Sequence, residues 1–464
     1  MIAGECRGAT NILKEVIRRR FKADLENFHN KYSKVADIWA LYDCYQRGGM
    51  MKITKNGSTK VLLAGMAGNL LEWFDFAVYG YFAVTIGKLF FPNEDPIAQV
   101  MAAFGVFAIG FLMRPVGGVL FGHIGDKYGR DKAMLVSIAA MAIPTFLVGL
   151  LPTYATLGLA APIILLFLRM IQGLSVGGEY TTSIVYMVEH SPAHRRGFIG
   201  SFAALGAVGG ILLGSAAGAV LAATLSEAEL QAWGWRVPFL LGLFIGLAGI
   251  VLRRGPATSA PQTVGESSPM RIAIRDHWGL MIKIAGLSMV NAVVFYLVFV
   301  YLVSWLQLVD GIAPERALEV NTTSMVLLLP VMLLSGALSD RIGGKVILIT
   351  STVLIFLLAW PLLWLMHSDN VLAIYLGQGV FAIIIGLFLG AQPAYMVNLV
   401  PANVRCSATG LAYNLTLGVA GGFTPMVATW LVSRTHDDLS PAYMIMAASL
   451  LSFVALLSTK DQTA

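Results

Sequence analysis

The chain has 464 residues, of which 57% are hydrophobic and 12% are charged, and a mean hydropathy of +0.73 excludes an ordinary soluble globular domain. The net charge of +6 does not indicate nucleic-acid binding, because the basic residues form short clusters between long apolar runs. Cys6, Cys44 and Cys406 have no metal-ligand spacing and form no even disulfide framework, so we expect no metal site and no redox cofactor.

The first 56 residues differ from the rest of the chain. Charged residues of both signs alternate there, and no apolar run reaches the length needed to cross a bilayer. The segment also lacks the apolar core and small-residue cleavage site of a signal peptide. We therefore expect residues 1–56 to be a cytoplasmic extension, partly helical between Ile12 and Phe28. The adjacent Met50 and Met51 leave open an alternative translation start that would remove the extension.

Apolar runs near the ~20 residues of a transmembrane helix recur from residue 61 to residue 458. The sequence therefore predicts an all-α, polytopic membrane protein with twelve transmembrane helices in two six-helix halves. We place these spans at about residues 61–90, 99–121, 133–152, 158–187, 198–224, 235–252, 279–308, 321–338, 346–366, 371–399, 407–432 and 441–458.

The connectors between these spans alternate in charge. One set carries arginine and lysine, at 127–132, 195–196, 253–275, 341–345 and 405, whereas the alternate set is mainly acidic. Because cytoplasmic loops carry an excess of basic residues, we expect the first set and both termini to be cytoplasmic, in a multi-pass protein of the cell (inner or plasma) membrane.

An internal duplication divides the chain in two. The connector at 253–278, rich in Pro, Gly, Ser and Thr, predicts a cytoplasmic linker between an N-terminal half at 57–252 and a C-terminal half at 279–464. One set of residues recurs at a constant offset, Gly122, Asp126, Lys127 and Gly129 as Gly336, Asp340, Arg341 and Gly343. A second segment, MVEHSPAHRR from Met187, is echoed by MVNLVPANVR from Met396, so a repeated six-helix unit is indicated.

Ionisable residues inside the predicted spans gather in the N-terminal half, although each costs roughly 3 kcal/mol or more in the hydrocarbon. Glu72 and Asp75 share one helix face in the first span, with Tyr79 one turn beyond. The others are Arg114 in the second span and Arg169 and Glu179 in the fourth. Three carboxylates facing two arginines leave one acid without a fixed partner, which a proton carrier needs. The alternative is a static lattice of ion pairs between helices.

Several segments resemble known families. GHIGDKYGRDK at 122–132 resembles the signature loop of the major facilitator superfamily, and GALSDRIGGK at 336–345 its degenerate second copy. GNLLEWFDFAVYGYFA (68–83), FLMRPVGG (111–118), RMIQGLSVGGEY (169–180) and WGWRVPF (233–239) resemble the metabolite:proton symporter family, which includes proline/betaine, α-ketoglutarate, shikimate and citrate transporters. The likeness covers about residues 60–460. It implies symport by alternating access, with substrate bound near the midplane between the halves.

The resemblance also implies roles for individual residues. Proton-coupled sugar porters of the superfamily use an aspartate in span one with an arginine in span four, and the motifs align Asp75 and Arg169 with these positions. Glu179 and Glu72 are further candidates for proton coupling, and the proton is the one coupling ion we expect, without a cofactor. The signature loops imply a conformational latch made by Gly122, Asp126, Arg130, Glu189, Arg196, Asp340 and Arg341.

Polar residues on the spans are candidates for a substrate site, although interhelical hydrogen bonds explain many such residues as well. An arginine suits a carboxylate, and the aromatic residues around Trp73 suit a quaternary ammonium. A proline- or betaine-like zwitterion and an organic acid such as α-ketoglutarate both remain open. The candidates are Arg114, Tyr79, Gln172, Asn291, Tyr296, Gln378 and Asn414. We expect a monomer in the lipid bilayer with a small-molecule substrate and no nucleic acid.

Functions of other classes fit the sequence less well. The main alternative is an exporter or antiporter of a drug or siderophore. Superfamily exporters often carry a Gly-Pro element in span five, and GAVGGILLGSAAG at 206–218 lacks proline, which favours uptake. An enzyme is not expected, because the sequence has no His cluster, Ser/His arrangement or phosphate-binding loop, and so no catalytic residues are predicted.

Overall fold

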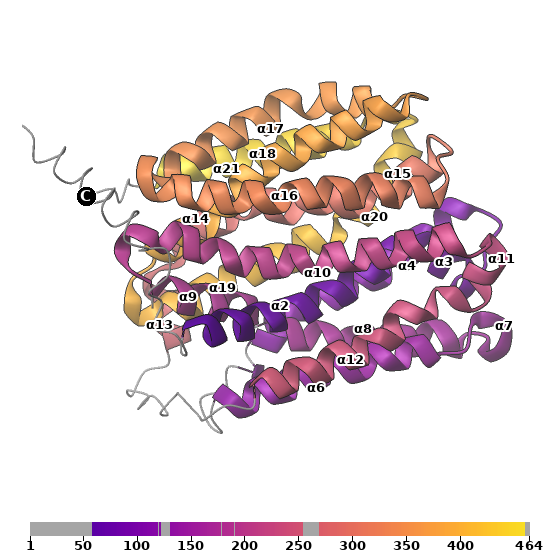
Figure 1. Ribbon diagram of the computed structural model, residues 1–464, viewed down its shortest axis with the longest axis horizontal. Helices are drawn as coiled ribbons and strands as arrows, with labels where there is room; N and C mark the ends of the chain where they lie inside the picture. The colour runs from indigo at the N-terminus through magenta and orange to yellow at the C-terminus, as the bar shows by residue number, and fades with distance from the viewer. Residues whose placement is uncertain are drawn as a thin grey trace, which may run out of the picture. The chain divides into compact units, whose positions relative to one another are not determined.

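The computed structural model describes residues 58–118, 120–121, 130–177, 179–189, 191–253 and 269–459, and in these residues the chain is helical without a strand (Figure 1). The predicted extension at 1–56 and the latch residues Gly122 and Asp126 lie outside the described residues. The side chains of Arg130 and Glu179 also lie outside them, although both residues begin helices.

All six spans predicted for the N-terminal half are present as helices. The helix of the second span ends at Leu112 and resumes at Arg114, and the other bounds differ from the prediction by only a few residues. The first is divided after Tyr81 and the fourth after Val176. They are α2 (Ser58–Tyr81) with α3 (Ala83–Phe90), α4 (Pro96–Leu112), α6 (Arg130–Leu150), α8 (Ala160–Val176) with α9 (Glu179–Glu189), α10 (Arg196–Thr224) and α12 (Arg236–Arg253).

The six spans predicted for the C-terminal half are present as well, two of them interrupted by π-helical turns. They are α14 (Trp278–Leu287) with η3 (Val290–Phe295), η4 (Leu297–Tyr301) and α15 (Leu302–Leu308), α16 (Pro314–Ile342), α17 (Gly344–Met366), α18 (Val371–Asn398), α19 (Arg405–Thr416) with η6 (Leu417–Gly421) and α20 (Gly422–Thr435), and α21 (Pro441–Ser458). Within the predicted linker, the described part forms a short helix, α13 (Pro269–Asp276).

Length and side-chain distribution suit these helices to a bilayer. Within the described residues, nine helices are long and apolar enough to cross a membrane. Large apolar side chains such as Leu159, Phe167, Phe244, Leu334 and Trp364 are exposed on the outer faces. Such an apolar exterior is unfavourable in water and favourable in lipid, so the outer faces are lipid-facing surfaces.

Local sequence signals start several helices. The Asp95 side chain accepts a hydrogen bond from Ile97 N at 2.9 Å, and Pro96 occupies the first position of α4. Asn370 caps α18 in the same way, accepting from Leu372 N at 3.0 Å. These caps satisfy backbone donors that have no partner inside the helix.

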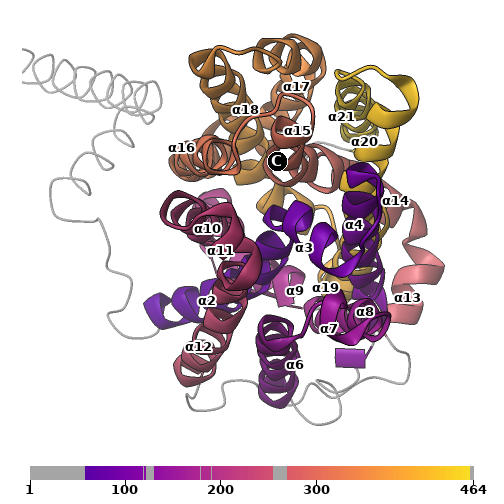
Figure 2. The same cartoon turned by 90° about the vertical axis from the view of Figure 1, so that its right-hand side faces the viewer.

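The helices pack as two groups that meet along two seams (Figure 2). In the first group α6 packs against α8 and α12, and in the second α17 packs against α18 and α21. The groups meet where α10 packs against α16 and where α4 packs against α20. Residues far apart in the sequence therefore face one another between the halves.

Glycines bring α4 and α8 into close contact within the first group. A Cβ atom at Gly173 would overlap the carbonyl oxygen of Gly110, and one at Gly117 would overlap that of Leu174. Small residues let two backbones approach in this way. The same approach sets the carbonyl group of Arg169 against Gly110 and that of Arg114 against Gly177, so each arginine backbone lies beside a glycine of the opposite span.

The alternating connectors lie at opposite ends of the bundle. At one end, where α9 and α18 finish (left in Figure 1), are the connectors with Arg196, Arg341 and Arg405, and we call this the basic end. The other end holds α11 (Glu227–Glu229) and the connectors with Asp95 and Asp310. The segregation of charge therefore matches the pattern from which the cytoplasmic side was predicted.

Candidate functional site

The carboxylate of Asp75 in α2 is the centre of a buried network. It accepts hydrogen bonds from Arg169 Nη1 at 2.6 Å and from Gln172 Nε2 at 2.9 Å, both in α8. The Gln172 amide also donates to Thr145 Oγ1 of α6 at 2.9 Å. The ring of Tyr79 lies 4.0 Å from Arg169 Cζ, in cation–π contact. The pairing predicted for Asp75 and Arg169 is thus formed, and it is shielded from solvent by buried neighbours.

Glu72, one turn before Asp75, forms a second buried pair with Arg114, which follows α4 in the same span. Arg114 Nη2 donates to Glu72 Oε1 at 3.2 Å. The guanidinium carbon lies 4.9 Å from the ring centroid of Phe111 and 5.3 Å from that of Trp73. Arg114 Nε and Nη1 find no hydrogen-bond acceptor among the described residues. This pair is therefore longer than the first and retains unused donors.

Charge is confined to one half of the bundle interior. Within the described parts of the spans, the buried charged residues are Glu72, Asp75, Arg114 and Arg169, all from the N-terminal half. In the C-terminal half, Lys283 near the end of a span is partly exposed and donates to Ser458 O at 2.9 Å. The four buried groups pair one to one, so a surplus acid depends on Glu179, which stays a prediction.

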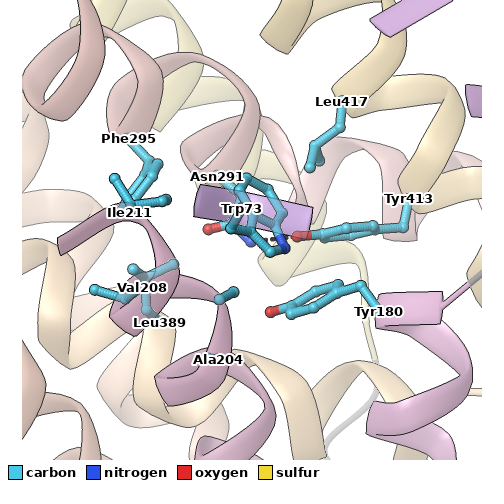
Figure 3. Close-up of a pocket in the computed structure, with 11 residues that line it drawn as sticks. Trp73, Tyr180, Ala204, Val208, Ile211, Asn291, Phe295, Leu389, Tyr413 and Leu417 are labelled. Carbon is cyan, nitrogen blue, oxygen red and sulfur yellow. Dashed lines mark hydrogen bonds between the residues drawn. The ribbon is translucent and has the colours of Figure 1, made fainter. Parts of the chain in front are cut away.

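A small cavity lies between the two halves, toward the middle of the spans that line it (Figure 3). The space open to the centre of a water molecule is about 20 Å³, which is room for about one water rather than for an amino acid. The halves are therefore closed around this cavity. Its lining comes from Trp73, Tyr180, Ala204, Ala207, Val208 and Ile211 in the N-terminal half and from Asn291, Phe295, Leu389, Tyr413 and Leu417 in the C-terminal half.

Three aromatic rings from different helices form one wall of the cavity. Tyr180 of α9 stacks on Tyr413 of α19 with ring centroids 5.3 Å apart, and Trp73 of α2 meets Tyr180 edge to face at 6.0 Å (Figure 3). Because Tyr413 belongs to the C-terminal half, this wall crosses the boundary between the halves. Any ligand held against it would contact both halves at once.

An amide cluster forms the polar part of the cavity. Asn291 Nδ2 donates to Gln392 Oε1 at 2.9 Å and to Tyr413 Oη at 3.0 Å. Asn291 lies in η3, and Leu417 begins η6, so both π-helical segments contribute to the lining. Single π-helical turns within helices are frequent at functional sites, because they redirect side chains and are easily rearranged.

The predicted substrate-binding residues fall at different distances from the cavity. Among them, and within the described residues, Asn291 lines the cavity directly. Arg114 and Tyr296 stand behind the Trp73 ring, with the Tyr296 centroid 6.2 Å from it. Tyr79 and Gln172 belong to the Asp75 network instead, and Tyr79 Oη donates to Ala103 O at 3.0 Å.

Two other predicted residues make contacts away from the cavity lining. Gln378 Nε2 donates to Asn321 Oδ1 at 2.9 Å, and Asn321 in turn donates to Ser215 Oγ of α10 at 3.1 Å. Asn414 Nδ2 donates to Gly177 O at 2.6 Å, across the boundary between the halves. Both amides thus take part in hydrogen bonds between helices, the alternative that the sequence left open.

The described latch residues form contacts between the halves at the basic end. Asp340 of α16 accepts hydrogen bonds from Gly197 N at 2.7 Å and Phe198 N at 2.9 Å, at the start of α10. Glu189 pairs with Arg405 Nη1 at 2.7 Å. Arg196 Nη1 donates to Asn398 Oδ1 at 3.4 Å. Arg341 is exposed.

The sequence interpretation missed Tyr180 and Tyr413 as cavity residues. Tyr180 directly follows Glu179, and Tyr413 directly precedes Asn414, so each stands one position from a predicted site residue. Tyrosines were predicted in spans one and seven, but not in spans four and eleven. Only the division of span four after Val176 and the packing of α9 on α19 bring the two tyrosines together.

The family model of the Major Facilitator Superfamily matches residues 66–425 of this chain, which is most of its length. The chain belongs to the major facilitator superfamily. It is 35% identical over 417 residues to the proline/betaine transporter of Salmonella typhimurium, covering 87% of this chain and 83% of the relative. It is 36% identical, with the same coverage, to the glycine betaine/proline/ectoine/pipecolic acid transporter of Dickeya dadantii.

Solved structures of the superfamily share the fold at low sequence identity. The crystal structure of a D-xylose-proton symporter aligns with a TM-score of 0.69 at 19% identity, covering 87% of this chain and 98% of the other. A partially occluded, inward-open xylose transporter from E. coli aligns with a TM-score of 0.67 at 17% identity, covering 88% and 98%. The major facilitator chain described here is thus a multi-pass membrane transporter with the twelve-helix fold, and not an enzyme.

Proposed function

We propose that this chain is a secondary active transporter that couples uptake of a small polar metabolite to proton entry by alternating access. The observation that carries the proposal is the buried carboxylate of Asp75, which accepts hydrogen bonds from Arg169 and Gln172. It lies two positions along α2 from Trp73, a residue that lines the cavity between the two halves. The proton is the coupling ion, and no further cofactor is needed. We propose that the protein acts as a monomer in the cell membrane, with both termini in the cytoplasm.

Asp75 has the surroundings that a proton carrier requires. In the ionised state its charge is balanced by Arg169 at 2.6 Å, and protonation removes this attraction. A neutral Asp75 would leave Arg169 without its counter-charge in a medium of low dielectric, so protonation favours a rearrangement of α2 against α8. Through such a coupling between charge state and helix packing, binding of a proton can change the side of the membrane to which the cavity opens.

Names of the relatives favour a substrate that carries both a positively charged nitrogen and a carboxylate. The relatives described above are named as transporters of proline, betaine, ectoine and pipecolic acid. We therefore place a proline- or betaine-like zwitterion before an organic acid such as α-ketoglutarate. All of these compounds have a carboxylate that an arginine can bind.

The test compares two transport modes of Asp75→Asn in the same proteoliposomes. Uptake of labelled proline or betaine against its gradient, driven by an imposed pH difference, is expected to vanish, because asparagine cannot release and regain a proton. Exchange of labelled for unlabelled substrate is expected to survive in part, since the loaded carrier never needs to deprotonate during exchange. Asp369→Asn, at an exposed connector, is the matched control and should retain both modes.

A static ion-pair lattice makes the opposite prediction. Removing one charge from a buried pair costs about 3–5 kcal/mol, so the unfolding midpoint, uptake and exchange would fall together. Intact gradient-driven accumulation by Asp75→Asn would exclude Asp75 as the carrier and make Glu179 the next residue to examine.

A further inference from the structure

One wall of the cavity between the halves is made of aromatic rings and contains no acidic side chain, and such a wall can bind a cation. The rings of Trp73, Tyr180 and Tyr413 lie within 5.3–6.0 Å of their neighbours, and they come from α2, α9 and α19. The π-face of an aromatic ring attracts a cation, most strongly when water is excluded. A quaternary or secondary ammonium is well suited to such a wall, because it is large, weakly hydrated and makes few or no hydrogen bonds.

Hydrogen-bond donors without acceptors gather at the same place. Trp73 Nε1, Gln392 Nε2, and Arg114 Nε and Nη1 are buried, and none has an acceptor among the described residues. Trp73 lines the cavity, Arg114 lies behind its ring, and Gln392 accepts from the cavity residue Asn291. An unpaired buried donor is unfavourable by about 1–3 kcal/mol. A bound carboxylate, which only accepts hydrogen bonds, would satisfy several of these donors at once.

From these two features, and on the basis of the function proposed above, we infer that the cavity binds a compact zwitterion in one orientation. Its ammonium group packs against Trp73, Tyr180 and Tyr413, and its carboxylate turns toward Trp73 Nε1, Gln392 and Arg114. A dicarboxylate fits this site poorly, because its second carboxylate would meet the negative faces of the rings. Since Tyr413 and Gln392 belong to the C-terminal half, the zwitterion holds the two halves together.

The cavity must widen before such a ligand enters. At about 20 Å³ of space for a water centre, it cannot hold a zwitterion in the closed arrangement. Separation of α9 from α19 would part Tyr180 from Tyr413 and open the aromatic wall. The geometry of this open cavity is not needed to test the site. Ligands of similar shape but different charge can be compared, and the order of their affinities reports which charges the site binds.

The experiment measures equilibrium binding to the purified full chain in detergent, with no pH gradient. The ligands are glycine betaine, 3,3-dimethylbutanoate and choline. In 3,3-dimethylbutanoate a neutral carbon replaces the ammonium nitrogen of betaine and the shape is kept, whereas choline keeps the ammonium and lacks the carboxylate. In the wild-type protein, betaine should bind at least about tenfold more tightly than 3,3-dimethylbutanoate, the ratio expected for a desolvated cation–π contact.

Two variants then separate the ends of the ligand. Trp73→Phe keeps a ring but removes the N–H group, so betaine should weaken about five- to tenfold. Choline should weaken less than betaine, because it loses only part of the cation–π attraction and has no carboxylate to lose a donor. Tyr180→Leu removes a ring, so betaine and choline should weaken alike, about tenfold, while 3,3-dimethylbutanoate is unchanged. Trp360→Phe and Tyr443→Leu, which alter exposed rings, are the matched controls and should change nothing.

The outcomes distinguish this inference from the function on which it rests. Equal binding of betaine and 3,3-dimethylbutanoate to the wild-type protein would overturn the aromatic site even if a variant failed to fold. Equal weakening of all three ligands in both variants would also overturn it, because that is the signature of a structural role. Proton-driven betaine uptake would remain intact in either case. Absence of proton-driven uptake of betaine, proline and α-ketoglutarate alike would refute the proposed function itself.

Discussion

The guanidinium of Arg169 is held by both charge and shape. Its Nη1 donates to Asp75 at 2.6 Å, while its planar face lies 4.0 Å from the centroid of Tyr79. Lysine carries the same charge but lacks the planar fork and the stacking face. The distinction matters here because the side chain is buried, so water cannot replace a lost contact.

We therefore expect Arg169→Lys to reduce gradient-driven uptake by at least tenfold, equivalent to about 1.4 kcal/mol, although the charge is kept. Uptake in proteoliposomes, normalised to correctly folded protein by size-exclusion chromatography, is the measurement. The matched control is Arg316→Lys, in an exposed pair with Glu319 at 2.6 Å, where the effect should be negligible. Wild-type uptake by Arg169→Lys would show that only the charge at this position matters.

Sequence reasoning predicted the charged residues of the site better than its aromatic ones. A charge inside an apolar run is conspicuous because it is costly, and the pairing of Asp75 with Arg169 followed from helix spacing together with a family resemblance. Tyr180 and Tyr413 gave no such signal, since an aromatic residue in a membrane span is equally suited to lipid or to a packed interior. Their stacking depends on how α9 and α19 meet, which no local pattern encodes.

At the scale of elements, the contact between α4 and α8 depends on glycine. A side chain at Gly173 would overlap the backbone of Gly110, which cannot yield as a flexible side chain would. Gly209 of α10 is the matched comparison, because apart from its two chain neighbours and the backbone of its own helix, no described atom lies within 4 Å of the position where its Cβ would stand. The two positions share the residue type and a helical backbone but differ in their surroundings.

Gly173→Ala is accordingly expected to destabilise the protein by about 1–3 kcal/mol, the usual range for overpacking, and to lower uptake, since α8 carries Arg169. Gly209→Ala should be neutral or should stabilise by up to about 1 kcal/mol, because alanine is the better helix former. Thermal unfolding midpoints in detergent would measure both. Equal midpoints for the two variants would contradict the proposed close packing.

The positions of the helices were predictable because apolar runs of bilayer length leave few alternatives. The π-helical segments η3 and η6 were not, since they arise from side-chain packing between helices rather than from a local preference. Gly421 illustrates this: a Cβ there would press on the Tyr296 ring and the Ala292 carbonyl. The backbone path of α19 to α20 is thus set by its neighbours across the fold.

On the scale of the whole molecule, Asp340 connects the halves by capping a helix of the opposite half. Its two oxygens accept from Gly197 N and Phe198 N at the start of α10, where the helix dipole favours an anion. Loss of such a cap costs about 0.5–2 kcal/mol. The contact joins α16 to α10, so separation of these helices at the basic end would break it, and its loss would then cost the closed state alone.

Asp340→Ala should therefore raise the open-to-closed ratio at the basic end by about 2- to 30-fold. The reporter is Ala204→Cys in the cavity wall, in a background with Cys6, Cys44 and Cys406 replaced by serine. The rate at which a maleimide labels this cysteine from each side of the membrane measures the opening on that side. Asp95→Ala removes a comparable cap inside one half and should leave the rate unchanged. Equal acceleration by both variants would refute a latch at Asp340.

The confinement of buried charge to the N-terminal half has an evolutionary consequence. After a duplication, both copies begin with the same constraints, but here the buried ion pairs of the described spans lie in one copy only. The other copy contributes Asn291, Phe295, Leu389, Tyr413 and Leu417 to the cavity and can change there without altering these buried pairs. If the pairs carry the proposed proton coupling, new substrate preferences can arise by mutation in the second copy while the first keeps the means of energising transport.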